Sequence, residues 1–294
     1  DYAMIKIPAK GNLVVNGKME TMQTATQFKE GMKVELLVGY NDNNKLRFKG
    51  FVRRVNYTVP CEIECEGYSY QLRKKLNFTK NYSNSTVKKI LEDLVEGTDI
   101  KLSKSIPNVP IKRAEFRNCT GTQVIDWLKD KCLLTVYFNY DELYCGLAYV
   151  APSNKIKLRL GWNVIKDSSL KFNDNKEFAN VRIKLVQRGK TGVKKVSFYG
   201  PKDGQVVEKK ISLIDDPKVL EDIAKREKER LTNRGYEGSV TAFLEPCFNV
   251  GDSIVIEDIK YQERKGTYLG TGVEGEFSPS GGRQKITIGM SLGV

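Results

Sequence analysis

The sequence predicts an α+β fold that is mainly β: two small antiparallel β-barrels, an intervening α+β module, and one helix inserted in the second barrel. Short strands separated by turn residues fill residues 1–76 and return after residue 155. Two amphipathic helical segments lie between these regions, and an apolar fraction of 40% can form packed cores. We therefore expect domains at residues 1–76, 77–150 and 151–294.

The first barrel is predicted from strands within residues 1–76. Residues 34–40 form an apolar strand that ends at residues 41–44, an Asn/Asp cluster that tolerates positive φ. Residues 46–55 alternate in polarity, and we expect a bulge at Gly50. Residues 61–66 form the next strand and lead into Tyr68-Ser69-Tyr70. Period-2 alternation places Cys61, Ile63 and Cys65 on one face of that strand and three glutamates on the other.

The α+β module begins near residue 77. Residues 85–97 predict an amphipathic helix, with Ser85 as the candidate N-cap and Gly97 at the C′ position. A second helix is expected at residues 120–131. It leads into a strand pair, residues 133–139 and 143–150.

The second barrel is predicted from the strands after residue 155. One helix interrupts them at residues 216–234, with Asp216 as its cap and Pro217 at N1. Along one stripe of this helix the residues Leu220, Ile223, Ala224, Glu227 and Leu231 repeat. The expected strands are residues 155–160, 179–187, 194–199, 236–244, 253–256, 267–274 and 285–292.

The chain contains no histidine, and this excludes several chemistries. Ser-His-Asp and Cys-His nucleophiles, HExxH zinc sites and histidine acid–base catalysis are impossible within it. No apolar run approaches the roughly 18–20 residues that span a bilayer, and we expect no signal peptide. Six cysteines include Cys61 and Cys65, which resemble half of a metal site but have no second pair. We expect buried free thiols, a reducing compartment, no metal and no cofactor.

Glycine-rich and acidic segments give no sign of an active site. The segments 266–272 and Gly281-Gly282 match neither phosphate-binding motif, and we expect hairpin turns there. The carboxylate pairs Glu62/Glu64, Glu92/Asp93 and Asp215/Asp216 are expected at helix starts or on solvated faces. Serine–lysine chemistry stays formally open, although no S-x-x-K stands at a helix start after a strand. No catalytic residue is therefore assigned.

The charge balance raises an alternative function. Lysine and arginine number 49 against 36 acidic residues, a net charge of +13. Basic residues cluster at Arg53-Arg54, Arg73-Lys74-Lys75, Lys194-Lys195 and Lys209-Lys210. The helix at 216–234 mixes both signs, as solvated helices do. A nucleic-acid-binding β-barrel protein is the alternative, but the charge fits solubility or contact with acidic neighbours in an assembly better.

The order of motifs along the chain resembles the baseplate hub proteins of contractile phage tails. That group includes the phage late control D proteins and the phage Mu tail hub, with the N-terminal part of the type VI secretion spike protein VgrG as a relative. The motifs are a G-x-x-V…G-Y strand at 31–40, F-x-G-x-V at 48–52, a T-v-x-x-I helix at 86–94, P-x-x-x-x-G-D at 246–256 and a Gly-rich stretch at 266–282. Relatives often have a histidine near Gly275 and Glu276, which this chain lacks.

The resemblance implies a structural protein without catalysis. Such hubs are homotrimers whose two barrels per chain form a pseudo-sixfold ring between the tail tube and the spike. It further implies assembly in the bacterial cytoplasm, a place in the virion tail baseplate, and passage of DNA through the ring. Because some tail proteins carry hydrolase domains, hydrolysis of peptidoglycan or polysaccharide is a third hypothesis.

Overall fold

The computed structural model describes residues 1–147, 149, 154–173, 180–188, 194–211, 213–260 and 265–293. The chain divides into two compact units. The first comprises Asp1–Asn108, Arg113–Asp130 and Val136–Cys145, and the second comprises Val109–Lys112, Lys131–Thr135 and Gly146–Val294. Strands make up 54% of the chain and two sheets are curled half-barrels, so the mainly β, α+β class is confirmed.

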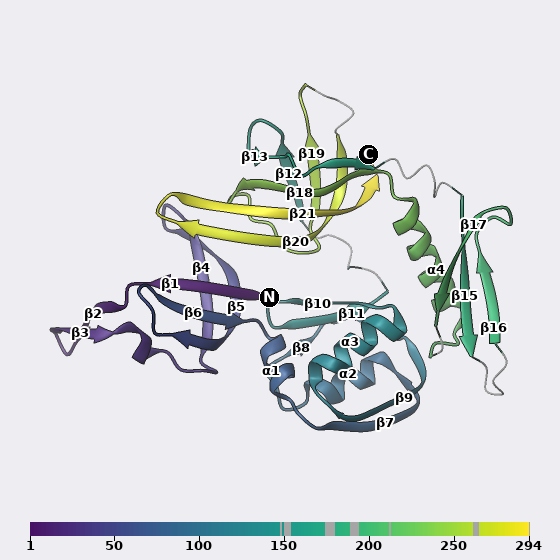
Figure 1. Cartoon of the computed structure of the whole chain (residues 1–294), viewed down its shortest axis with the longest axis horizontal. Coiled ribbons are helices and arrows are strands. Elements are labelled where there is room, and N and C mark those ends of the chain that lie inside the picture. The colour runs from purple at the N-terminus through teal and green to yellow at the C-terminus, as the bar shows by residue number, and fades with distance from the viewer. Residues whose placement is uncertain are drawn as a thin grey trace. The chain divides into compact units, whose positions relative to one another are not determined.

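The first unit contains a four-stranded antiparallel sheet in the order β1-β6-β5-β4 (Figure 1). One face carries a core that includes Val52, Ile63 and Phe48, together with the buried thiols of Cys61 and Cys65. The alternation predicted for residues 61–66 produces this core, because every second side chain of β6 points inward. The strands are β1 (Tyr2–Ile7), β4 (Lys33–Tyr40), β5 (Asn43–Asn56) and β6 (Cys61–Glu66).

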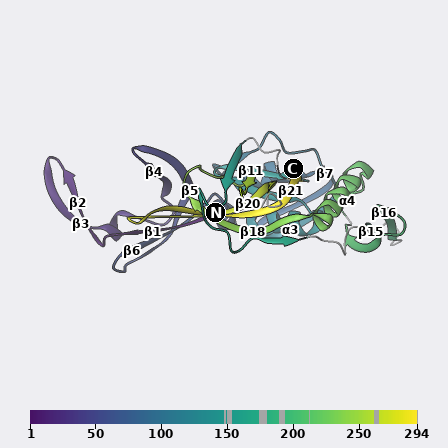
Figure 2. The ribbon, with the colours of Figure 1, turned by 90° about the horizontal axis from the view of Figure 1, so that it is seen from above.

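Two tight turns in this unit require left-handed backbone. The Asn/Asp cluster joins β4 to β5 as predicted, with Asn41 at φ 52° and Asp42 at φ 62°. Asn16 and Gly17 make the equivalent turn of a separate hairpin, with φ of 52° and 78°. Asn, Asp and Gly tolerate this conformation. Both views of the ribbon show the hairpin extending from the sheet (Figures 1 and 2). It comprises β2 (Lys10–Val15) and β3 (Lys18–Gln23), and the 3-10 helix η1 (Thr24–Gln27) follows it.

The rest of the first unit is the α+β part. Its predicted helices are present, but the N-cap of α2 is Thr86, not Ser85, because the Thr86 hydroxyl accepts a hydrogen bond from the Lys89 amide. Ser85 still belongs to strand β7. Gly97 follows the helix with φ 75°, as predicted. The elements are α1 (Ser69–Lys74), β7 (Phe78–Thr86), α2 (Val87–Val95), β8 (Lys101–Leu102), β9 (Pro110–Cys119), α3 (Gly121–Cys132), β10 (Thr135–Asn139) and β11 (Glu142–Gly146).

The second unit contains the other curled sheet, in the order β12-β19-β20-β21-β18-β13. It is not wholly antiparallel, because β12 pairs in parallel with β19. The glycine-rich segment 266–272 was expected as a hairpin turn and also, from residue 267, as part of a strand. The strand is correct and the turn is not, because the segment lies within β20. Gly270 has no room for a side chain there, since a Cβ would lie 2.0 Å from the Phe248 ring. The strands are β12 (Lys155–Arg159), β13 (Val164–Lys166), β14 (Lys171–Asn173), β18 (Gly235–Phe243), β19 (Ser253–Glu257), β20 (Gly266–Ser278) and β21 (Gly281–Gly293).

Two strands that we assigned to the second barrel form a separate sheet instead. This sheet has the order β16-β15-β17, from β15 (Val181–Arg188), β16 (Lys194–Tyr199) and β17 (Gln205–Lys210). Helix α4 (Pro217–Thr232) packs against β15, and Ile183, Leu185 and Ile223 are fully buried. Asp216 caps α4 through the Lys218 and Val219 amides, with Pro217 at N1, as predicted.

The bulges of β5 are not at Gly50. The pairing of β4 with β5 shifts register between Leu36 and Leu37, and the pairing of β5 with β6 shifts between Val52 and Arg54. Gly50 has a different role, because a Cβ there would lie 2.2 Å from the backbone oxygen of Glu66. The residue is a glycine because two backbones meet at this point.

Replacing Gly50 with alanine should therefore lower the free energy of unfolding by about 2 kcal/mol, since backbone atoms cannot give way to the new methyl group. Urea denaturation of the intact chain would measure this. Gly275→Ala is the matched control, because nothing lies within 4 Å of a Cβ at that glycine and its φ is not left-handed. Equal stability of the two variants would contradict the close-approach interpretation.

Candidate functional site

The basic triplet Arg73-Lys74-Lys75, the densest cluster of cations in the sequence, is fully engaged within the first unit. The Arg73 Nε donates to Glu66 at 2.9 Å, and Lys74 pairs with Glu30 at 2.6 Å. Lys75 donates to the carbonyl oxygens of Leu94 and Glu96 at 2.8 and 2.7 Å, at the C-terminus of α2. Because these cations already have partners, the triplet gives no support to a nucleic-acid site.

Glu66 departs from the sequence prediction. We expected the three glutamates of β6 on the solvent side of the sheet. Glu62 and Glu64 agree with this, since both are only partly buried. Glu62 pairs with Lys6 at 2.7 Å, and Glu64 accepts from Asn56 at 3.0 Å. The Glu66 side chain is only 2% exposed, and it accepts from Arg73 and from the Ser69 hydroxyl of α1. A buried carboxylate needs such partners. The contacts of Glu66 with Arg73 and Ser69 therefore fix α1 against the sheet.

The other predicted carboxylate pairs are structural as well. Asp93 of α2 is largely buried and contacts Lys80 at 3.3 Å, Lys89 at 3.0 Å and the Tyr82 hydroxyl at 2.9 Å. Burial alone would raise the pKa of Asp93, but these three hydrogen bonds outweigh it and hold the pKa below its usual value. Asp215 pairs with Lys112 at 2.6 Å, beside the cap residue Asp216.

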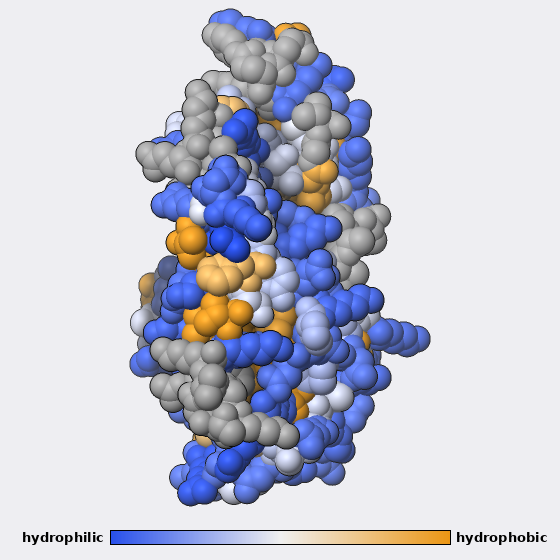
Figure 3. Space-filling model, turned by 90° about the vertical axis from the view of Figure 1, so that its right-hand side faces the viewer, coloured by the Kyte–Doolittle hydropathy of each residue, from blue (hydrophilic) through white to orange (hydrophobic). Residues whose placement is uncertain are grey.

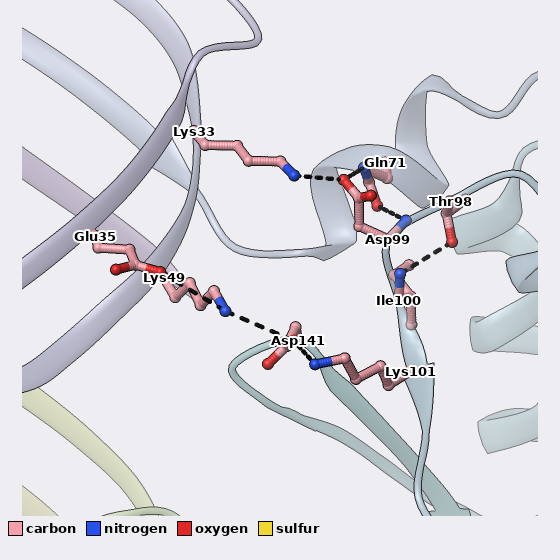
Figure 4. A network of polar contacts seen from close by, with 9 residues as sticks. All are labelled: Lys33, Glu35, Lys49, Gln71, Thr98, Asp99, Ile100, Lys101 and Asp141. Carbon is pink, nitrogen blue, oxygen red and sulfur yellow. Dashed lines mark hydrogen bonds and ion pairs between the residues drawn. The ribbon is translucent and has the colours of Figure 1, made fainter.

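A polar network connects the sheet of the first unit to its α+β part (Figure 4). Asp99 accepts from Lys33 at 3.1 Å and from the Gln71 amide at 3.0 Å. Asp141, in the turn between β10 and β11, lies 2.9 Å from Lys101 and 3.6 Å from Lys49. These contacts lower the pKa of both carboxyl groups, chiefly through Lys33 and Lys101 respectively. Asp99 and both of the lysines nearest the two carboxylates are exposed, and Asp141 is half-buried, so the network orients the parts more than it stabilises them.

A second charged cluster anchors α4 in the second unit. The Glu227 side chain is 8% exposed, and its oxygens lie 3.2 Å from Lys209, 3.2 Å from Arg226 and 3.3 Å from Arg230. Arg226 also donates to the backbone oxygens of Leu133 and Leu147. The sequence predicted a solvated mixed-charge face, but Arg226 and Glu227 instead tie α4 to Leu133, Leu147 and Lys209 of the same unit.

The cysteines and acidic residues form no recognisable chemical centre in the described ranges. Cys61 and Cys65 are buried and free, as predicted, and burial raises the pKa of the Cys65 thiol to about 11. Within those ranges no three Cys, Asp or Glu side chains are placed to hold a metal ion. No helix in the described part of the chain is long and apolar enough to cross a membrane.

Comparison with known proteins identifies the fold. No protein-family model matches the sequence, and no curated protein matches it. A tail protein from Neisseria meningitidis MC58 superposes with a TM-score of 0.60 at 13% identity, over 98% of this chain and 96% of that one. The chain has the fold of a phage tail protein. The 43 kDa tail protein of prophage MuSo2 from Shewanella oneidensis gives a TM-score of 0.56 at 14% identity, over 98% and 87% of the two chains.

The same fold extends to a secretion protein. A component of the E. coli type VI secretion system, itself similar in structure to T4 bacteriophage tail proteins, gives a TM-score of 0.54 at 10% identity. The match covers 87% of this chain and 63% of that one. The resemblance drawn from the order of sequence motifs is thus confirmed at the level of the fold.

Proposed function

We propose that this chain is a structural baseplate hub protein of a phage or prophage tail, or of a related contractile injection apparatus. The observation that carries the proposal is the match to a tail protein over nearly the full length of both chains. It is supported by the ion pairs that Arg73, Lys74 and Lys209 of the basic clusters make within the chain. The chain thus acts by assembly and not by catalysis.

In this proposal three copies form a ring that joins the tail tube to the spike. Each copy contributes two curled half-barrel sheets, which gives the ring a pseudo-sixfold inner wall through which DNA passes. Assembly takes place in the bacterial cytoplasm, and the ring then belongs to the virion baseplate. Tail tube and spike proteins are its partners.

Sedimentation equilibrium of the purified chain at micromolar concentrations tests this proposal. We expect a mass three times that of the chain, with ring-shaped particles in negative-stain images. A chain that stays monomeric at all concentrations and is absent from purified tail particles would contradict it. A gel shift with DNA that weakens steeply as salt rises would instead favour the nucleic-acid-binding alternative.

A further inference from the structure

The three-stranded sheet of the second unit has one face covered by α4 and one face open. Val181, Ile183 and Leu185 of the central strand point toward α4 and are fully buried. The opposite face, which we call the outer face, carries the alternate residues of all three strands. Its described members are the half-buried Arg182 and Lys184, the buried Val186, and the exposed Val196, Phe198, Val206, Glu208 and Lys210.

The outer face is more apolar than a solvated sheet face. Val196, Phe198 and Val206 are 41%, 46% and 51% exposed, whereas an antiparallel sheet usually turns polar residues to water. Figure 3 views the molecule from the side of Figure 1 on which β16 and β17 lie, and apolar residues gather there among charged ones. Exposed patches of this kind, rimmed by polar groups, mark interaction sites.

The charges on the outer face are unbalanced. It carries the cations Arg182, Lys184 and Lys210 against Glu208, which pairs with Lys184 at 2.8 Å. The Arg182 guanidinium lies 4.3 Å from the centre of the Phe198 ring. Arg182 contacts no carboxylate in the part of the chain that the structure describes. An arginine held over an aromatic ring is preorganised to receive a planar anion.

We propose that the outer face docks onto an acidic protein surface that also carries apolar side chains, supplied by a different tail protein. This rests on the proposed function, which places the chain in a multi-protein assembly. A second copy packed face to face would bring the same unpaired cations together, and like charges at an interface oppose association. A partner that sets carboxylates opposite the central strand and apolar side chains opposite the edge strands would match both the aromatic–arginine pair and the two valines.

Cysteine labelling in assembled particles tests the docking surface. In a Cys119→Ser/Cys247→Ser background, which removes the two cysteines that are not fully buried, single variants Phe198→Cys and Val206→Cys are treated with a polyethylene glycol maleimide. Lys225→Cys, on the exposed side of α4, is the matched control. We expect rapid labelling of all three isolated chains, and at least tenfold slower labelling at 198 and 206, but not at 225, within purified tail particles.

Charge reversal tests the chemistry of the partner. Arg182→Glu/Lys210→Glu should lower incorporation into particles at least tenfold, whereas Lys225→Glu should not. Two results would overturn this inference and leave the proposed function standing. One is free labelling of positions 198 and 206 in particles that contain the chain. The other is normal incorporation of the charge-reversed variant. Protection in the isolated chain together with a doubled mass would show that a second copy covers the face, and would also overturn it. Absence of the wild-type chain from particles would overturn both proposals.

Discussion

Arg73→Leu is expected to lower the free energy of unfolding by about 3 kcal/mol, because it leaves the buried Glu66 carboxylate without its cation. Glu66 is 2% exposed, and Arg73 reaches it with Nε and Nη2 both at 2.9 Å. Water gains only partial access, since Phe51 stacks on Tyr70 beside the pair with ring centroids 5.4 Å apart. Urea denaturation of the intact chain at neutral pH measures the loss.

Lys74→Leu is the matched control for this variant. Lys74 is the next residue of the same helix, but its partner Glu30 is exposed, so its removal should cost below about 1 kcal/mol. The double variant Arg73→Leu/Glu66→Gln should recover part of the loss, because the neutral amide is cheaper to bury than an unpaired carboxylate. Equal stability of Arg73→Leu and Lys74→Leu, or no recovery in the double variant, would count against the buried ion pair.

Local patterns in the sequence predicted the elements whose signals are themselves local. The alternation of residues 61–65, the Asn/Asp turn after β4 and the Asp216-Pro217 start of α4 all appear where expected. Helix α1 was missed, since Tyr68-Ser69-Tyr70 resembles a continuing strand. It has six residues and no side-chain N-cap, and contacts of Phe51 with Tyr68 and Tyr70 hold it in place. Tertiary packing decided its conformation, which a single-sequence pattern does not reveal.

Strand pairing and charge pairing were the less predictable features. The polar sequence of β7 gave no strand signal, yet it pairs with β9 and buries Phe78 against Phe116. Strands β15 and β16 have ordinary strand patterns, so the sequence did not show that they lie outside the barrel sheet. What places them in a separate sheet is the parallel pairing of β15 with β17 and the packing of α4 on β15. The burial of Glu227 could have been predicted from the sequence, because this residue lies on the same helical stripe as Leu220, Ile223 and Ala224. A carboxylate at such a core-facing position needs cationic partners.

Glu227→Gln should lower the free energy of unfolding by about 3 kcal/mol at pH 7, because Lys209, Arg226 and Arg230 lose their shared anion in a buried setting. Burial opposes ionisation of Glu227, but the hydrogen bond from Lys209 and the charges of Arg230 and Arg226 prevail, so its pKa in the folded chain lies below the usual 4.5. A carboxyl group with a lowered folded pKa stabilises the fold above its unfolded pKa. That stabilisation is lost as the pH falls through the folded pKa.

The difference in stability between the wild type and Glu227→Gln should therefore be constant from pH 7 to about pH 5 and shrink at lower pH. Denaturation series at several pH values would measure it, with Glu229→Gln on the exposed side of α4 as the matched control. That control should differ little from the wild type at every pH. A difference for Glu227→Gln that stays constant down to pH 3 would mean that the carboxylate charge is not what holds α4. The two hydrogen bonds from Arg226 to the Leu133 and Leu147 carbonyls, together with the apolar packing of α4 on β15, would then carry the attachment.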